Sequence, residues 1–160
     1  MRSAERAGPL RPYFAYGSNL AHARMAERIP SSRPAGIARL DGYDVVCNKL
    51  GRDGSAKANL EASGEALVWG VLYELVEAEL QILDRFEGGY ERIQVSVTRD
   101  DGASLLAVTY QSHRITENRV PFDWYRALIV EGARAHGLPD SYVGALEALP
   151  SRPDPSRRPR

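Results

Sequence analysis

The chain has 160 residues, of which 43% are hydrophobic and 26% charged, so it is long enough to bury one continuous core and too apolar for a disordered protein. Its 21 basic and 21 acidic residues cancel, which leaves no overall field to favour nucleic acid or an anionic membrane as a partner. Cys47 is the only cysteine, and no stretch is apolar enough for a signal peptide or a membrane span. We therefore expect a cytoplasmic protein that binds a small molecule, as a monomer or weak homodimer.

One domain is predicted over residues 12–149. The segments before and after it, 1–11 and 150–160, contain prolines and arginines and little that could be buried. We expect both of these tails to be disordered.

The first half of the predicted domain is a strand, a helix and three extended segments, at residues 12–16, 20–29, 36–50, 57–63 and 65–75. Pro30 ends the helix, because proline cannot continue its hydrogen bonds. Asp41 and Gly42 predict a bend in the first extended segment. Gly70 predicts a bulge or kink in the third.

The second half is predicted to be a helix, a hairpin and two further helices, at residues 76–89, 90–110, 121–137 and 139–149. Ile93, Val95 and Val97 alternate with polar residues, which indicates a sheet with one core face. Strands mixed with segregated helices predict an α+β domain, built as a small, mostly antiparallel barrel or a strongly curved sheet.

Several kinds of catalytic site are disfavoured by the pattern. His22, His113 and His136 have no spacing typical of metal ligands. Ser18 lacks the Gly-x-Ser-x-Gly context of a serine nucleophile, and Cys47 lies in an apolar strand. No phosphate loop or dinucleotide motif occurs. We therefore expect no metal and no cofactor.

The stretch "YGSN", residues 16–19, joins the first strand to the first helix. Such a junction directs free backbone N–H groups to one point and suits a carboxylate or an oxyanion. Gly17 lets a ligand approach the backbone, and Ser18 or Asn19 could cap the helix and also reach the ligand.

Glu87 is predicted in the last turn of a helix, directly before Gly88 and Gly89. The negative end of the helix dipole disfavours a carboxylate there. Burial and the dipole would both raise its pKa toward the range that a general acid or base needs. The alternative is an exposed glutamate with a small cost in stability.

Four motifs in order resemble the γ-glutamylcyclotransferase family: "YGSNL", "VWGVLYEL", "LDRFEGGYERIQV" and "WYRALIVEGARAHGLPDSY", over roughly residues 13 to 148. The resemblance implies a small mixed-topology, mostly antiparallel β-barrel with flanking helices. It also implies the release of 5-oxoproline from a γ-glutamyl substrate, a cyclising acyl transfer connected with glutathione metabolism, without a cofactor.

The resemblance also assigns site residues. Glu87 corresponds to the catalytic acid/base, and the substrate-binding positions are Tyr16, Gly17, Ser18, Asn19, Leu20, Tyr90 and Tyr125. Trp124 is an alternative to Tyr125 if the alignment shifts by one residue. Relatives often have a longer spacer where only two glycines separate Glu87 from Tyr90.

Asn19 distinguishes this loop from the YGSL loop of the glutathione-specific branch. Two functions are compatible with the sequence. The first is a cyclotransferase that acts on a γ-glutamyl amino acid or γ-glutamyl amine. The second is a non-catalytic small-molecule-binding or regulatory protein on the same fold, which would have no need of a carboxylate at Glu87.

Overall fold

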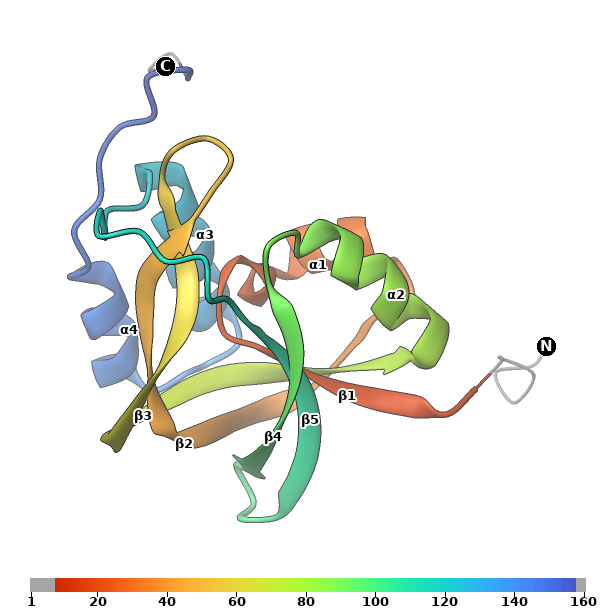
Figure 1. The fold of residues 1–160 in the computed structure, drawn as a ribbon. Coiled ribbons are helices and arrows are strands. Elements are labelled where there is room, and N and C mark those ends of the chain that lie inside the picture. Colours follow the sequence, from red (N-terminus) through yellow and green to blue (C-terminus); the bar gives the residue numbers. More distant parts are fainter. Residues whose placement is uncertain (1–7, 158–160) are drawn as a thin grey trace.

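Five segments of alternating apolar residues pair into a closed barrel, with strand order β1-β3-β2-β4-β5, in the computed structural model that describes residues 8–157 (Figure 1). The strands are β1 (Leu10–Ala15), β2 (Arg33–Leu50), β3 (Ala56–Val76), β4 (Glu91–Arg99) and β5 (Ser104–Gln111). The helices are the 3-10 turn η2 (Ser18–Leu20), α1 (His22–Arg28), α2 (Glu77–Phe86), α3 (Asp123–Ala135) and α4 (Asp140–Glu147).

The barrel is mixed because β1 pairs in both directions. It runs antiparallel to β3 over its whole length and meets β5 in parallel at Tyr13 and Val108. All other pairings between strands are antiparallel. Val95 and Val97 of β4 are buried, as their alternation indicates. The predicted α+β class with a small mixed, mostly antiparallel barrel is thus confirmed.

Strands β2 and β3 are longer than the other strands and extend beyond the barrel as a two-stranded arm (Figure 1). The bend predicted at Asp41 and Gly42 is confirmed, since Gly42 has φ +85° and the register shifts between Asp41 and Tyr43. The segments predicted at 57–63 and 65–75 form one continuous strand, because β2 pairs with both of them.

Gly70 does not form the predicted bulge or kink. The ladder continues in register through Ala38 and Gly70. A Cβ at this position would lie 2.4 Å from the carbonyl oxygen of Ala15 and 2.7 Å from the ring of Phe14. Glycine is needed here because the end of β1 lies close against β3 at this position.

The helix predicted at 20–29 begins later, at His22, and is preceded by η2. Leu20 is fully buried in the core, where it meets α3. A Cβ on Gly132 of α3 would lie 2.3 Å from the backbone carbon of Leu20. Packing of the loop against α3 therefore overrides the helix-forming tendency of its residues.

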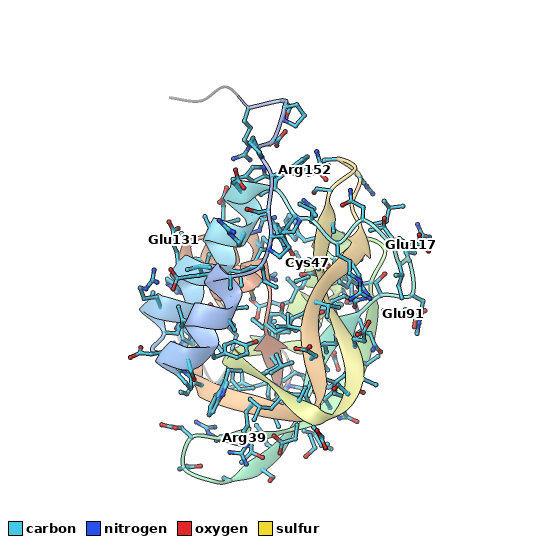
Figure 2. The ribbon with its side chains drawn as sticks, turned by 90° about the vertical axis from the view of Figure 1, so that its left-hand side faces the viewer. Arg39, Cys47, Glu91, Glu117, Glu131 and Arg152 are labelled. Carbon is cyan, nitrogen blue, oxygen red and sulfur yellow. The ribbon has the colours of Figure 1, made fainter. Side chains whose placement is uncertain are left out.

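Both ends of the described chain continue past the predicted domain limits. β1 begins at Leu10, and the segment after α4 returns to α3, where the carbonyl of Arg152 accepts a hydrogen bond from Asp123 N–H at 2.8 Å (Figure 2). Trp124 Nε1 donates to Asp154 at 2.8 Å. The remaining residues of the expected tails, 1–7 and 158–160, lie outside the described residues.

Within residues 8–157, none of the helices has the length and apolar character needed to span a membrane.

We expect Gly132→Ala to destabilise the protein, because the added methyl group would overlap the backbone of Leu20 and push η2 away from α3. Overpacking of this kind costs about 1–3 kcal/mol. The measurement is the free energy of unfolding from urea denaturation.

Gly144→Ala in α4 is the matched control, since a Cβ there meets nothing within 4 Å. It should stabilise the protein by up to about 1 kcal/mol through helix propensity. Equal effects of the two substitutions would contradict the close contact at Gly132.

Candidate active site

The loop after β1 carries the predicted YGSN residues at the end of the barrel that α1 and α2 cover (Figure 1). Beyond Ala15 the chain leaves the sheet and turns in η2, where the N–H of Leu20 donates to the Gly17 carbonyl at 3.0 Å. A Cβ on Gly17 would lie 3.2 Å from the Cβ of Ala58 in β3. Glycine at this position lets the loop pass close to β3.

Three successive backbone N–H groups in this loop, those of Gly17, Ser18 and Asn19, have no hydrogen-bond acceptor among residues 8–157. All three residues line a small cavity of about 30 Å³. Unpaired N–H groups beside a cavity suit a carboxylate or a developing oxyanion. The loop therefore has the donors that the sequence predicts for an anion site.

Glu87 caps the C-terminal end of α2. Its N–H donates to the carbonyl of Leu83 at 3.0 Å, and its own carbonyl accepts from the N–H of Tyr90 at 3.0 Å. Gly89 completes the turn with φ +86°, a conformation that glycine adopts without strain. The helix end and the turn together fix the direction of the Glu87 side chain.

The carboxylate of Glu87 meets the predicted loop directly. Asn19 Nδ2 donates to Glu87 Oε1 at 3.0 Å, and Arg28 Nη1 lies 3.5 Å from the same oxygen. Arg28 also donates to Asn19 Oδ1 at 3.1 Å, while Asn19 Nδ2 lies 3.0 Å from the hydroxyl of Tyr13. The side chain of Asn19 thus joins the loop to α2. Neither η2 nor α1 has a side-chain cap, so the suggested capping role of Ser18 or Asn19 is wrong.

Burial raises the pKa of Glu87, whose side chain is only 14% exposed. Arg28, Arg24, the hydrogen bond from Asn19 and Lys49 act in the opposite direction and lower this pKa. Burial is the largest effect, so the pKa of Glu87 lies above its ordinary value. This is the direction predicted from the sequence.

Five of the ten residues that line the small cavity are tyrosines: the predicted Tyr16, Tyr90 and Tyr125, together with Tyr13 and Tyr110. Tyr90 OH donates to the carbonyl of Ala58, and Tyr125 OH accepts from the N–H of the same residue at 3.0 Å. Burial raises the pKa of Tyr16, Tyr90 and Tyr125, so these phenols stay neutral. They shape the cavity and fix β3 beside the loop.

Two predicted positions need separate comment. Leu20 was assigned to substrate binding, but it is fully buried and lines neither this cavity nor the larger one beside it. Its side chain belongs to the core. Tyr125 lines both cavities and Trp124 lines neither, so the structure favours the alignment without a shift.

A larger cavity of about 370 Å³ adjoins the small one, and Ser18, Glu87, Tyr90 and Tyr125 belong to both. Its other walls include Arg24, Arg28 and Lys49, which the sequence analysis missed. Arg24 and Arg28 stand four residues apart on α1 and so share one helix face, a spacing that could have been recognised. Lys49 gave a weaker signal as a lysine inside an apolar strand.

No group of three or more His, Cys, Asp or Glu residues that could hold a metal ion occurs within residues 8–157. Cys47 is buried on β2, and its burial raises the pKa of the thiol to about 11. A thiol of this kind is protonated and unreactive near neutral pH. The carboxyl of Glu87 accepts a hydrogen bond from the loop, through Asn19.

Comparison with known proteins identifies relatives of this chain. The model of the AIG2-like family matches residues 67–146, half of the chain. γ-Glutamylcyclotransferases from Bos taurus and Homo sapiens are each 32% identical over 147 residues, which cover 86% of this chain and 77% of each relative. The chain belongs to the γ-glutamylcyclotransferase family. A solved γ-glutamyl cyclotransferase structure superposes with a TM-score of 0.86 at 27% identity, covering 95% of this chain and 94% of the other.

The chain is thus an enzyme of the γ-glutamylcyclotransferase family. The residues of its candidate site come from two separate parts of the sequence. Glu87, Tyr90 and Tyr125 fall within the segment matched by the family model, whereas Tyr16 to Asn19 precede it. The fold unites these parts through the hydrogen bond between Asn19 and Glu87.

We expect Glu87→Gln to change how stability depends on pH. A carboxyl whose pKa is raised by folding binds its proton more tightly in the folded state, so it stabilises the fold at low pH and loses that contribution as the pH rises through the raised value. The wild-type free energy of unfolding should therefore fall relative to that of Glu87→Gln as the pH rises above 4.5, the ordinary value for glutamate. Urea denaturation of both proteins at several pH values measures this difference.

Glu91→Gln serves as the control, because the Glu91 side chain is 67% exposed. The free energy of unfolding of Glu91→Gln relative to wild type should not change with pH in the same way. A wild-type protein that gains stability relative to Glu87→Gln over the same rise in pH would contradict the raised pKa.

Proposed function

We propose that this protein converts a γ-glutamyl amino acid or γ-glutamyl amine into 5-oxoproline and the free amine, with Glu87 as general acid and base. The observation that carries the proposal is the contact of the buried Glu87 carboxylate with Asn19 of the YGSN loop, at 3.0 Å, beside a cavity. Membership of the γ-glutamylcyclotransferase family supports the same reaction class.

The reaction needs little beyond positioning and proton transfer. The α-amino nitrogen of the substrate attacks its own γ-carbonyl carbon, so one C–N bond forms in a five-membered ring while the original amide C–N bond breaks. Both reacting groups belong to one molecule, and an enzyme that folds the substrate into attack geometry removes most of the entropic barrier. A proton leaves the attacking nitrogen, and a proton is added to the leaving nitrogen.

Glu87 has the properties required to carry that proton. It must be ionised to accept a proton from the attacking nitrogen and protonated to donate one to the leaving nitrogen. Burial raises its pKa toward the pH at which both forms are accessible, while Arg28 and Asn19 keep the ionised form accessible. We assign the proton transfer between the two nitrogens to this single carboxyl.

The loop supplies the complementary role. The unpaired N–H groups of Gly17, Ser18 and Asn19 are suited to bind the α-carboxylate of the substrate or the oxyanion of the tetrahedral intermediate. Tyr16, Tyr90 and Tyr125 enclose the aliphatic part of the γ-glutamyl group in this assignment. The site therefore binds the substrate without a covalent bond to the enzyme.

Asn19 also bears on the choice between branches of the family. A leucine at this position, as in the YGSL loop, would lose the hydrogen bonds of Asn19 to Glu87 and Tyr13 and the one from Arg28. We assign this protein to the YGSN branch and infer that glutathione is not its preferred substrate.

Glu87→Gln should lower kcat by about 10²–10⁴-fold, the usual contribution of a general acid or base. The residue keeps its size and can still accept the hydrogen bond from Asn19, so folding should be retained. The assay measures free 5-oxoproline after incubation with γ-glutamyl amino acids, γ-glutamyl amines and glutathione.

Glu91→Gln, the same change at an exposed carboxylate, should leave kcat unaltered. Undiminished turnover by Glu87→Gln would remove Glu87 from the mechanism. Binding of the γ-glutamyl compounds without any 5-oxoproline would instead favour a non-catalytic binding protein.

Ser18→Ala tests whether the loop attacks the substrate. His22, His113 and His136 line neither cavity, so Ser18 has no histidine base beside it. We expect kcat to fall by no more than about tenfold, the effect of one lost hydrogen bond. Removal of a serine nucleophile would cost about 10⁶-fold. A covalent adduct on Ser18, detected by mass spectrometry during turnover, would contradict this assignment.

A further inference from the structure

The larger cavity has a strongly unequal distribution of charge, although the chain as a whole has formal net charge 0. Its lining contains two acidic residues, Asp53 and Glu87. It also contains six basic residues: Arg24, Arg28, Lys49, Arg52, Lys57 and Arg85. Walls of one sign around a cavity concentrate ligands of the opposite sign.

The two acidic residues account for only two of these cations. Lys57 Nζ lies 3.0 Å from Asp53, and Arg28 Nη1 lies 3.5 Å from Glu87. Arg24, Lys49, Arg52 and Arg85 form no ion pair with any residue among 8–157. Four cations in the cavity walls are therefore left without a carboxylate from the described chain.

Arg24 shows the lack of an anionic partner most clearly. Its Nε atom is buried and has no hydrogen-bond partner among the described residues. A buried donor without an acceptor is destabilising, and more so when it is charged. Burial lowers the pKa of Arg24, and the neighbouring Arg28 lowers it further. An anion in the cavity would offset both effects.

Lys49 reaches the cavity from β2 and is only 7% exposed. Its Nζ donates to the carbonyl of Gly88 at 2.9 Å and lies 4.9 Å from the centre of the Tyr90 ring. A Cβ on Gly89 would lie 3.0 Å from this Nζ, so the two-glycine turn leaves space for the lysine. The ammonium group is held beside Glu87 and keeps capacity for further hydrogen bonds.

Arg52 and Arg85 are exposed and come from different walls of the cavity. Arg52 lies in the turn between β2 and β3, and Arg85 lies in the last turn of α2. The positive charge thus extends from the half-buried Arg24 and the buried Lys49 to exposed residues in two other elements.

One γ-glutamyl group does not account for these cations. It has a single α-carboxylate, for which the loop N–H groups of the small cavity are suited. Glu87 stands where the two cavities join and, in the proposed reaction, protonates the leaving nitrogen. The larger cavity then receives what is attached to that nitrogen.

We infer that the larger cavity selects a leaving group with two or more carboxylates, an acidic amino acid or acidic peptide, over a neutral amine. This inference rests on the proposed function, and it names the substrate class. γ-Glutamyl-glutamate is the simplest such substrate. γ-Glutamyl-glutamine has nearly the same shape and one carboxylate fewer.

The first test compares kcat/KM for these two dipeptides by release of 5-oxoproline. We expect γ-glutamyl-glutamate to be favoured by about tenfold, equivalent to about 1.4 kcal/mol. The ratio should decrease as salt is added, because salt screens the charges. Equal kcat/KM values for the two dipeptides would overturn the inference and leave the proposed function intact.

Substitutions of single arginines test which residues produce the preference for γ-glutamyl-glutamate. Arg52→Gln and Arg85→Gln each remove one exposed cation of the cavity, so they should lower kcat/KM more for γ-glutamyl-glutamate than for γ-glutamyl-glutamine. Arg39→Gln, on β2 near the β4–β5 hairpin and outside the cavity lining, should leave the ratio unchanged (Figure 2). A ratio that none of the cavity variants alters would contradict the role of these cations.

Calorimetry separates the two proposals if no 5-oxoproline is released. The probes are the same two dipeptides, titrated into wild type and into Glu87→Gln. Tighter binding of γ-glutamyl-glutamate to both proteins would support the anion-selective cavity while the proposed reaction fails. Equal affinities would reject the cavity inference on its own.

Discussion

The hydrogen bond from Asn19 to the buried carboxylate of Glu87 is the contact on which the arrangement of the site depends. A buried carboxyl is costly unless its oxygens have partners. Here those partners come from the loop after β1 and, through Arg28, from α1. Because Asn19 also accepts from Arg28 and contacts Tyr13, one amide joins three elements. The position of the Glu87 carboxylate and the position of the loop therefore depend on each other.

Close packing at glycines holds these elements at the required distances. Gly17 brings the loop against Ala58, Gly70 brings β3 against β1, and Gly132 brings α3 against Leu20. In each case the nearest neighbouring atom belongs to the backbone or to an alanine side chain. The positions of the catalytic candidates are thus set by the main chain, and the tyrosines then fill the remaining space.

Local patterns predicted much of this from the sequence. Alternation identified the strands, and the poor fit of a carboxylate at a helix end drew attention to Glu87, whose burial the structure shows. The predictions that failed concern contacts between segments far apart in the sequence. Nothing near Gly70 in sequence reveals that the end of β1 packs against it, and Leu20 is a core residue because of α3. Arg24 and Lys49 come from α1 and β2, and only the closed barrel brings them to one cavity.

The cations of the larger cavity and the raised pKa of Glu87 are opposed, since Arg28, Arg24 and Lys49 all lower that pKa. Burial prevails because Glu87 lies at the junction with the small, tyrosine-walled cavity, away from water. An anionic leaving group would offset part of the positive charge, so it would raise the pKa of Glu87 further once bound. Binding of such a substrate would then favour the protonated carboxyl, the form that must donate to the leaving nitrogen. In this way the charge of the leaving group would be coupled to the proton transfer that releases it.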